Sequence, residues 1–147
     1  MPFQKSDSQV FRGLNLAGMA LGLGLVGFAG AATAETYTCT MKPAGKSHAI
    51  PTQLVVTYDP ATATAQAFDG IIKHYVGNPI PATLKSKNAK RVLFTWTVPG
   101  VKNNSGQYAA GLVYSLNIQL PSGTANMTGK PQGYSNSWRG TGKCTVK

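Results

Sequence analysis

Few side chains in this chain could perform acid–base, nucleophilic or metal chemistry. Beyond residue 34 the acidic residues are Glu35, Asp59 and Asp69, and the histidines are His48 and His74. Hydrolysis of a glycosidic bond needs two carboxyl groups flanking it. Asp59 and Asp69, however, start turn sequences, where Asp bonds to its own backbone. We therefore expect that the protein is not an enzyme and that it binds neither a metal ion nor a cofactor. The alternative is a site formed by both histidines and one of the two aspartates.

The residues best suited to contact a ligand lie in segment 132–139, QGYSNSWR. Tyr134 and Trp138 are large aromatic side chains in a sequence otherwise typical of a solvent-exposed loop, and Arg139 follows directly. Exposed aromatic rings beside a cation suit stacking on sugars or the centre of a protein interface. Outward-facing rings on a surface shared with Lys143 would favour a binding function. The alternative is that both rings fold back and plug one end of the fold.

A second basic group comprises Lys85, Lys87, Lys90 and Arg91, which fall within seven residues. Proteins that bind single-stranded nucleic acids combine such charge with aromatic platforms. Here most aromatic residues are expected in the core, so the alternative is a solvated connector over 85–90. We keep Lys85, Lys87 and Lys90 as candidate binding residues.

Residues 1–34 are predicted to be a cleaved secretory signal peptide. A polar start with Lys5 and Arg12 precedes an uncharged run, 14–32, which ends in the small-x-small sequence Ala32-Thr33-Ala34. These are the three regions of such a peptide. The alternative is a transmembrane anchor, since the run approaches the roughly 20 residues that span a bilayer. We expect an exported protein, periplasmic or extracellular, without a stable membrane span after cleavage.

Residues 35–147 are predicted to form one domain, and they are strongly basic. They contain 12 basic and 3 acidic residues, a net charge of +9. An exported protein of this charge should adhere to anionic material. The alternative is that the charge only maintains solubility.

Cys39 and Cys144, near the two ends of this domain, are predicted to form a disulfide. An even pair of cysteines in an exported chain favours one. Closing a loop of 105 residues would stabilise the fold by about 4–5 kcal/mol in the chain-entropy model. Both cysteines fall on the apolar side of alternating segments, 36–41 and 140–146, so the bridge should tie the first strand to the last.

The segment 91–120 is predicted to be a hairpin at the centre of the core. Its apolar residues recur at every second position, which indicates strands with one buried face. They are Val92, Phe94, Trp96 and Val98, then Leu112, Tyr114, Leu116, Ile118 and Leu120. The loop 100–106 contains Asn and Gly residues that tolerate the backbone of a hairpin connection.

Further short strands are expected between turn signals, and helix content should be low. The expected strands are 53–58, 65–68, 71–76, a strand starting near 84, and 124–128, with loops at 77–81 and 129–137. Two prolines should keep 77–81 out of a sheet. The pattern predicts an all-β fold, a small antiparallel barrel or sandwich of about eight strands.

The surplus of basic and aromatic loop residues favours a non-catalytic binding module for an anionic envelope or extracellular partner. That partner would be an anionic polymer, lipid headgroups or an acidic protein. One alternative is an inhibitor of a secreted enzyme: the predicted architecture, though no loop motif, resembles that of small periplasmic lysozyme inhibitors. The charge argues against a basic lysozyme as target. The other alternative is a small-ligand carrier with its cavity inside a barrel.

Overall fold

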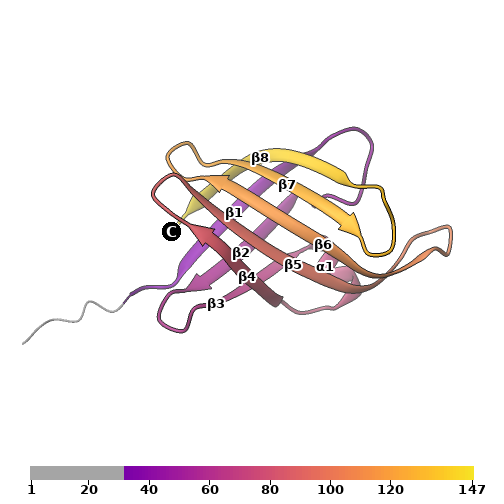
Figure 1. Cartoon of the computed structure of the whole chain (residues 1–147), viewed down its shortest axis with the longest axis horizontal. Coiled ribbons are helices and arrows are strands. Elements are labelled where there is room, and N and C mark those ends of the chain that lie inside the picture. The colour runs from indigo at the N-terminus through magenta and orange to yellow at the C-terminus, as the bar shows by residue number, and fades with distance from the viewer. Residues whose placement is uncertain (1–31) are drawn as a thin grey trace, which may run out of the picture. The chain divides into compact units, whose positions relative to one another are not determined.

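The alternation of apolar and polar residues builds eight antiparallel strands that close into a barrel (Figure 1). The structure, a computed structural model, describes residues 32–147; the predicted signal peptide, 1–34, lies outside the described residues except for 32–34. The strands are β1 (Glu35–Pro43), β2 (Gln53–Asp59), β3 (Thr64–Asp69), β4 (Ile80–Lys87), β5 (Arg91–Lys102), β6 (Tyr108–Gln119), β7 (Thr124–Pro131) and β8 (Trp138–Val146). Each strand pairs with the next along the chain, and β8 pairs with β1. The all-β prediction is confirmed, and the fold is a barrel rather than a sandwich.

A disulfide between Cys39 and Cys144 joins the first and last strands, as predicted. The two residues are direct neighbours in the β1–β8 register, their Cα atoms are 4.0 Å apart, and both are buried. Thr36 and Lys147 exchange two backbone hydrogen bonds at the end of the same strand pair. Because β1 and β8 pair along their length, the described sheet has no open edge to recruit another chain.

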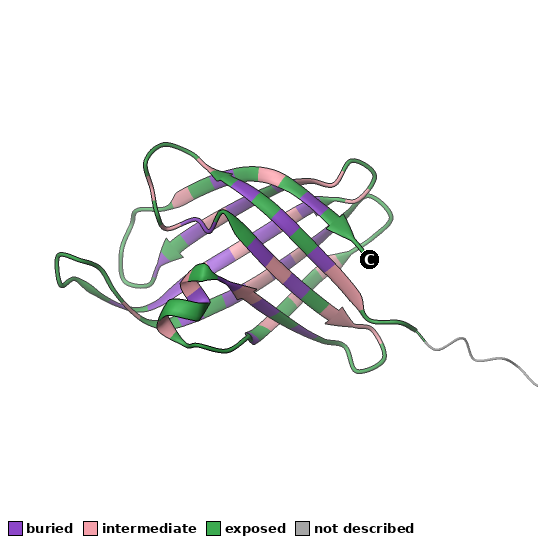
Figure 2. Ribbon diagram, turned by 180° about the vertical axis from the view of Figure 1, so that it is seen from behind, coloured by how far each residue is buried: buried purple, intermediate pink, exposed green. Residues whose placement is uncertain are grey.

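The β5–β6 hairpin forms the centre of the core, also as predicted. Its inward residues meet in register, with Phe94 opposite Leu116 and Trp96 opposite Tyr114, and all four are at most 3% exposed. The Trp96 and Tyr114 rings lie 5.6 Å apart, and the Phe94 ring packs edge-on against Tyr37 at 5.1 Å. Figure 2 shows the buried and exposed residues alternating along the strands. These side chains fill the barrel axis.

The prediction of a strand over 71–76 is wrong, because this segment contains a short helix, α1 (Gly70–Tyr75). The Asp69 carboxylate accepts hydrogen bonds from the backbone N–H groups of Ile71 and Ile72, at 2.7 and 2.9 Å. This N-cap satisfies donors that a helix start leaves free. A buried Ile72 then holds the helix against the barrel. Capping and one anchoring side chain outweigh the strand preference of the two isoleucines.

The boundaries predicted around β4 are also wrong. Ile80 and Pro81 belong to the strand, which pairs with β3 through three residues. Proline is tolerated there because it is the second residue of β4 and precedes the first pair with β5, Ala82 opposite Trp96. The strand continues to Lys87, past a register shift between Leu84 and Ser86, so 85–87 is not a connector.

The connections lie at two ends of the barrel, because neighbouring strands run in opposite directions. What we call the loop end carries the longer connections, 44–52, 70–79, 103–107 and 132–137. The terminal end carries Glu35, Lys147 and the tight turns at 60–63, 88–90 and 120–123. Figure 1 shows the tip of the β5–β6 hairpin projecting from the loop end, on the side away from the C-terminus.

Candidate functional site

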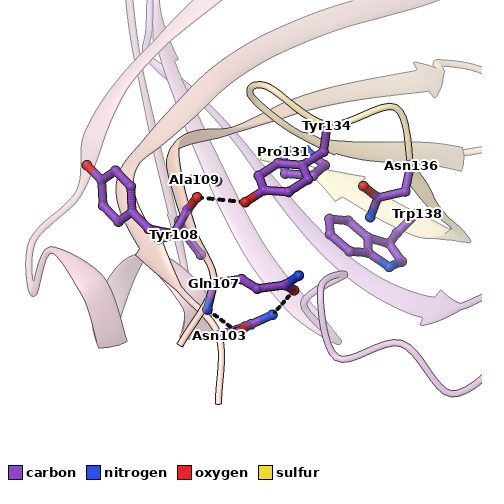
Figure 3. Close-up of a pocket in the computed structure, with 9 residues that line it drawn as sticks. Asn103, Gln107, Tyr108, Ala109, Pro131, Tyr134, Asn136 and Trp138 are labelled. Atoms are coloured by element: carbon purple, nitrogen blue, oxygen red, sulfur yellow. Dashed lines mark hydrogen bonds between the residues drawn. The ribbon is translucent and has the colours of Figure 1, made fainter. Parts of the chain in front are cut away.

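A pocket of about 120 Å³ lies at the loop end, between the tip of the β5–β6 hairpin and the β7–β8 connection. We call it the loop-end pocket (Figure 3). Its lining combines apolar residues, aromatic residues and side-chain amides: Val101, Ala109 and Pro131; Tyr108, Tyr134 and Trp138; Asn103, Gln107 and Asn136. None of these lining side chains carries a charge. Tyr134 and Trp138, the two aromatic candidates from the sequence, therefore share one site.

The hairpin side of the pocket is shaped by a bend and a locked turn. Gly100 has a φ of 63°, a left-handed value that suits glycine, and it interrupts the alternation of β5. After Gly100 the side chain that turns inward is that of Val101, which is half-buried and lies opposite the buried Ala109. Across the turn, the Asn103 amide donates to the Gln107 side-chain oxygen at 2.8 Å, and the Gln107 N–H donates to Asn103 Oδ1 at 2.9 Å. The two amides are thereby held at the pocket wall.

The β7–β8 connection is fastened to the same hairpin. Gln132 donates its backbone N–H to the Gly111 carbonyl at 2.8 Å. A Cβ on Gly111 would lie 2.6 Å from the Gln132 side-chain oxygen, so glycine permits this close approach. The Tyr134 hydroxyl donates to the Tyr108 carbonyl at 3.0 Å, as Figure 3 shows. Tyr134 is thus held across the gap between the two connections.

The aromatic residues differ in exposure and direction. Tyr134 is 41% exposed, whereas Trp138 is half-buried and packs against the core. The structure therefore combines the two arrangements considered from the sequence: Tyr134 faces solvent and Trp138 helps to cover the barrel end. Tyr108 is 60% exposed, and its ring points away from Tyr134 and Trp138 in Figure 3. It offers the pocket its backbone rather than its ring.

The structure separates the other candidate residues from the pocket, except Arg139. Arg139 follows Trp138 in β8 and is exposed on the outer surface opposite Thr128. Lys143 lies on the same outer face, further toward the terminal end, between Thr40 and Thr124. The sequence therefore identified a cation beside the pocket, but Lys143 does not line it.

Lys85, Lys87 and Lys90 lie toward the terminal end, away from the pocket. The register shift in β4 places Lys87 opposite the buried Val92, on the inner side of the barrel mouth. There Lys87 forms an ion pair with Glu35 and lies 5.6 Å from the centre of the Tyr58 ring. Lys87 therefore has partners within the fold.

The Glu35 carboxylate accepts two hydrogen bonds at this mouth of the barrel, one from Lys87 and one from Tyr37. Burial opposes its ionisation, but the hydrogen bonds from Lys87 and from the Tyr37 hydroxyl outweigh burial and lower the pKa of Glu35 below its ordinary value. Burial and this carboxylate raise the pKa of Tyr37. At this end Glu35, Lys87 and Tyr37 are thus engaged with one another, so we take the uncharged pocket at the other end as the candidate site.

The two ends carry equal numbers of exposed cations and differ in their acids. The terminal end has Lys85, Lys87, Lys90, Arg91, Lys143 and Lys147. Six exposed cations lie at or beside the loop end: Lys42, Lys46, Lys73, Lys102, Lys130 and Arg139. The acid of this end, Asp69, is 4% exposed and caps α1. Burial raises its pKa, against the two backbone hydrogen bonds that favour the charged form. The partly exposed acids, Glu35 and Asp59, lie at the terminal end.

Comparison of the chain with protein-family models, with curated proteins and with solved structures gave no match. Within residues 32–147, no three His, Cys, Asp or Glu side chains gather closely enough to hold a metal ion. The described residues include no helix of the length and hydrophobicity that crossing a bilayer requires.

Sequence reasoning missed the hairpin half of the pocket, namely Asn103, Gln107 and the Val101–Ala109 floor. A usable signal was present. In an antiparallel barrel whose strands follow one another in order, every second connection shares an end. Two strands separate the connection after β5 from the connection after β7, so these two had to lie together. Asn136 was missed because a loop asparagine is equally typical of a turn.

Proposed function

We propose that this protein is an exported, non-catalytic binding module whose loop end binds an anionic polymer of the envelope or the extracellular space. One observation carries the proposal: a pocket with two aromatic side chains has three exposed cations next to its lining residues in sequence, and the acid of that end is buried. A surface of one sign attracts counter-charged ligands and raises their local concentration.

Export is part of the proposal and rests on two features. A disulfide persists in an oxidising compartment, and Cys39 and Cys144 are bonded. The sequence of residues 1–34 fits a cleaved signal peptide. Fractionation of cells expressing the full chain, with the mature N-terminus sequenced, tests it: export should leave Glu35 as the first residue.

The alternatives from the sequence have less support. A carrier needs room inside the barrel, whereas Phe94, Trp96 and Tyr114 occupy the axis of this one. An inhibitor needs a loop that enters a target enzyme, whereas the hairpin tip that projects from the loop end forms one wall of the pocket.

The test is retention on immobilised polyphosphate under a salt gradient. We expect the wild-type protein to be retained at low salt and released as salt rises, because screening weakens contacts between exposed charges. The informative variant reverses three cations beside the pocket: Lys102→Glu, Lys130→Glu and Arg139→Glu. It should elute at clearly lower salt than wild type.

The matched control reverses three exposed cations toward the terminal end, namely Lys85→Glu, Lys90→Glu and Lys143→Glu. It changes the net charge by the same amount, so a smaller shift than that of the loop-end variant supports binding at the loop end. Equal shifts for both variants would mean that only total charge matters, and absence of retention at low salt would reject the proposed function.

A further inference from the structure

The loop-end pocket is an uncharged site within a basic surface, and this contrast restricts what can enter it. Three cations are adjacent in sequence to lining residues: Lys102 precedes Asn103, Lys130 precedes Pro131, and Arg139 follows Trp138. Neighbouring residues of a strand point to opposite faces, so the cations of β7 and β8 lie on the outer surface. The charged groups of a ligand would therefore stay outside while an uncharged part occupies the pocket.

That uncharged part must satisfy two kinds of surface at once. Trp138 and Tyr134 present apolar ring area, while Asn103, Gln107 and Asn136 present amide donors and acceptors. Asn103 and Gln107 already bond to each other, but a hydrocarbon chain would leave the remaining amide N–H groups of Gln107 and Asn136 without partners, which costs free energy. A bare phosphate or carboxylate would find no cation in the pocket to form the stronger, charge-assisted hydrogen bonds. A sugar ring has an apolar C–H face and a rim of hydroxyl groups, and it matches both surfaces.

A second, open hollow adjoins the pocket on the other side of Tyr134. The two share Pro131 and Tyr134, and the second also contains Lys130. Tyr134 thus lies between an uncharged compartment and one with a cation. A polymer that places one ring in the pocket would bring the acidic group of its neighbouring unit to Lys130.

We propose that the loop-end pocket binds a sugar ring of an acidic polysaccharide, with Lys130 meeting the adjacent acidic group. The inference rests on the proposed function and specifies its ligand class. A single-stranded nucleic acid is the competing polyanion with rings. Its binders, however, line a groove with successive aromatic platforms, whereas Trp138 is half-buried against the barrel and Tyr134 is held by its hydroxyl.

The first experiment follows tryptophan fluorescence during titration with polygalacturonate, polyphosphate or oligothymidylate. The chain has two tryptophans, and Trp96 is only 3% exposed, so a ligand-induced change reports Trp138. We expect polygalacturonate to change the emission and to bind more tightly at elevated salt than polyphosphate, which has no ring. An unchanged emission with polygalacturonate at saturation would overturn the sugar assignment.

The second experiment compares variants of two tyrosines. Tyr134→Ala should weaken polygalacturonate binding about tenfold, as expected for a contact at the centre of an interface, and leave polyphosphate binding unchanged. Tyr134→Phe keeps the ring and should retain most of the affinity. Tyr108→Ala is the matched control, because it removes a more exposed ring that points away from the pocket. If Tyr134→Ala lost its fold, Asn136→Ala would serve instead, since Asn136 is exposed.

The outcomes separate the two proposals. Binding of both polymers with no effect of Tyr134→Ala would overturn the sugar pocket and leave the proposed function standing. Failure of both polymers to bind at low salt would reject both. If Tyr134→Ala weakened the binding of oligothymidylate more than the binding of polygalacturonate, the ligand ring would be a nucleobase and not a sugar.

Discussion

Asp69 is a buried carboxylate that caps α1 and has one unpartnered oxygen. Its Oδ1 accepts the two capping hydrogen bonds, whereas Oδ2 has no partner among the described residues. Burial raises its pKa above the ordinary value of 3.8. A raised pKa means that the folded state holds the proton more tightly than the unfolded state. The charge therefore lowers stability above the raised pKa, and this penalty disappears below about pH 3.8.

We therefore expect Asp69→Asn to unfold at higher urea concentration than wild type at pH 7. Asn caps a helix about as well as Asp and carries no charge. The difference should shrink as the pH falls through the raised pKa, because wild-type Asp69 then becomes neutral too. Urea unfolding between pH 3 and pH 7 measures it.

Asp69→Ala is the control for the cap. It should be less stable than Asp69→Asn by about 1 kcal/mol at every pH, since alanine cannot cap. A wild type more stable than Asp69→Asn at pH 7 would contradict the predicted burial penalty and indicate a partner for Oδ2.

At the scale of elements, the β5–β6 hairpin stabilises the fold. Its inner aromatic residues are buried in the core and are not available to contact a ligand. Trp96→Ala should lower the free energy of unfolding by about 3–5 kcal/mol, the usual cost of truncating a buried aromatic. Retention on polyphosphate should not change, because the loop-end cations are untouched. Urea unfolding and the salt gradient together test this.

The neighbouring Thr97 supplies the control for that measurement. Its side chain is exposed, and Thr97→Ala should change stability by no more than about 0.5 kcal/mol. A fully stable Trp96→Ala protein would mean that the opposite face of β5 is the inner one.

The long strands β5 and β6 were predictable from their alternation of apolar and polar residues. Each strand has 12 residues, and a period of two sustained over most of such a length is typical of a strand and not of a helix. The segment 71–76 was not predictable, since a helix of six residues is too short to display its own period. Asp69-Gly70 was recognised as a turn signal, but capping from Asp69 starts a helix there. The register shift in β4, between Leu84 and Ser86, has no signature in the sequence, so the position of Lys87 opposite the inward Val92 could not be predicted.

One half of the candidate pocket was predictable from residue type, and the other half was not. Tyr134 and Trp138 are conspicuous as large aromatic residues in a polar loop, which residue type alone reveals. Asn103 and Gln107 acquire their place from the fold, because the strand order brings their turn next to that loop. Lys143 was assigned to the same surface, but its position along β8 takes it toward the other end.

At the scale of the whole molecule, the disulfide links the first strand to the last. Replacing Cys39 and Cys144 together with alanine should lower the free energy of unfolding by about 2–5 kcal/mol, mainly because the unfolded chain gains freedom. Binding at the loop end should persist, since the bridge does not line the pocket. Chemical unfolding of the double variant beside oxidised wild type gives the value. Equal stability would show that β1–β8 pairing alone closes the barrel.

The adjacency of Thr36 and Lys147 has a practical consequence for orientation. Both lie at the terminal end, where they are hydrogen-bonded to each other, whereas the pocket opens at the opposite end. A domain of residues 35–147 that is tethered at Glu35 or Lys147, to a fusion partner or a sensor surface, would hold its pocket away from the attachment point. The same adjacency suits circular permutation of residues 35–147: a short linker could join Lys147 to Glu35, and new termini could be opened in the turn 60–63 without disturbing the pocket.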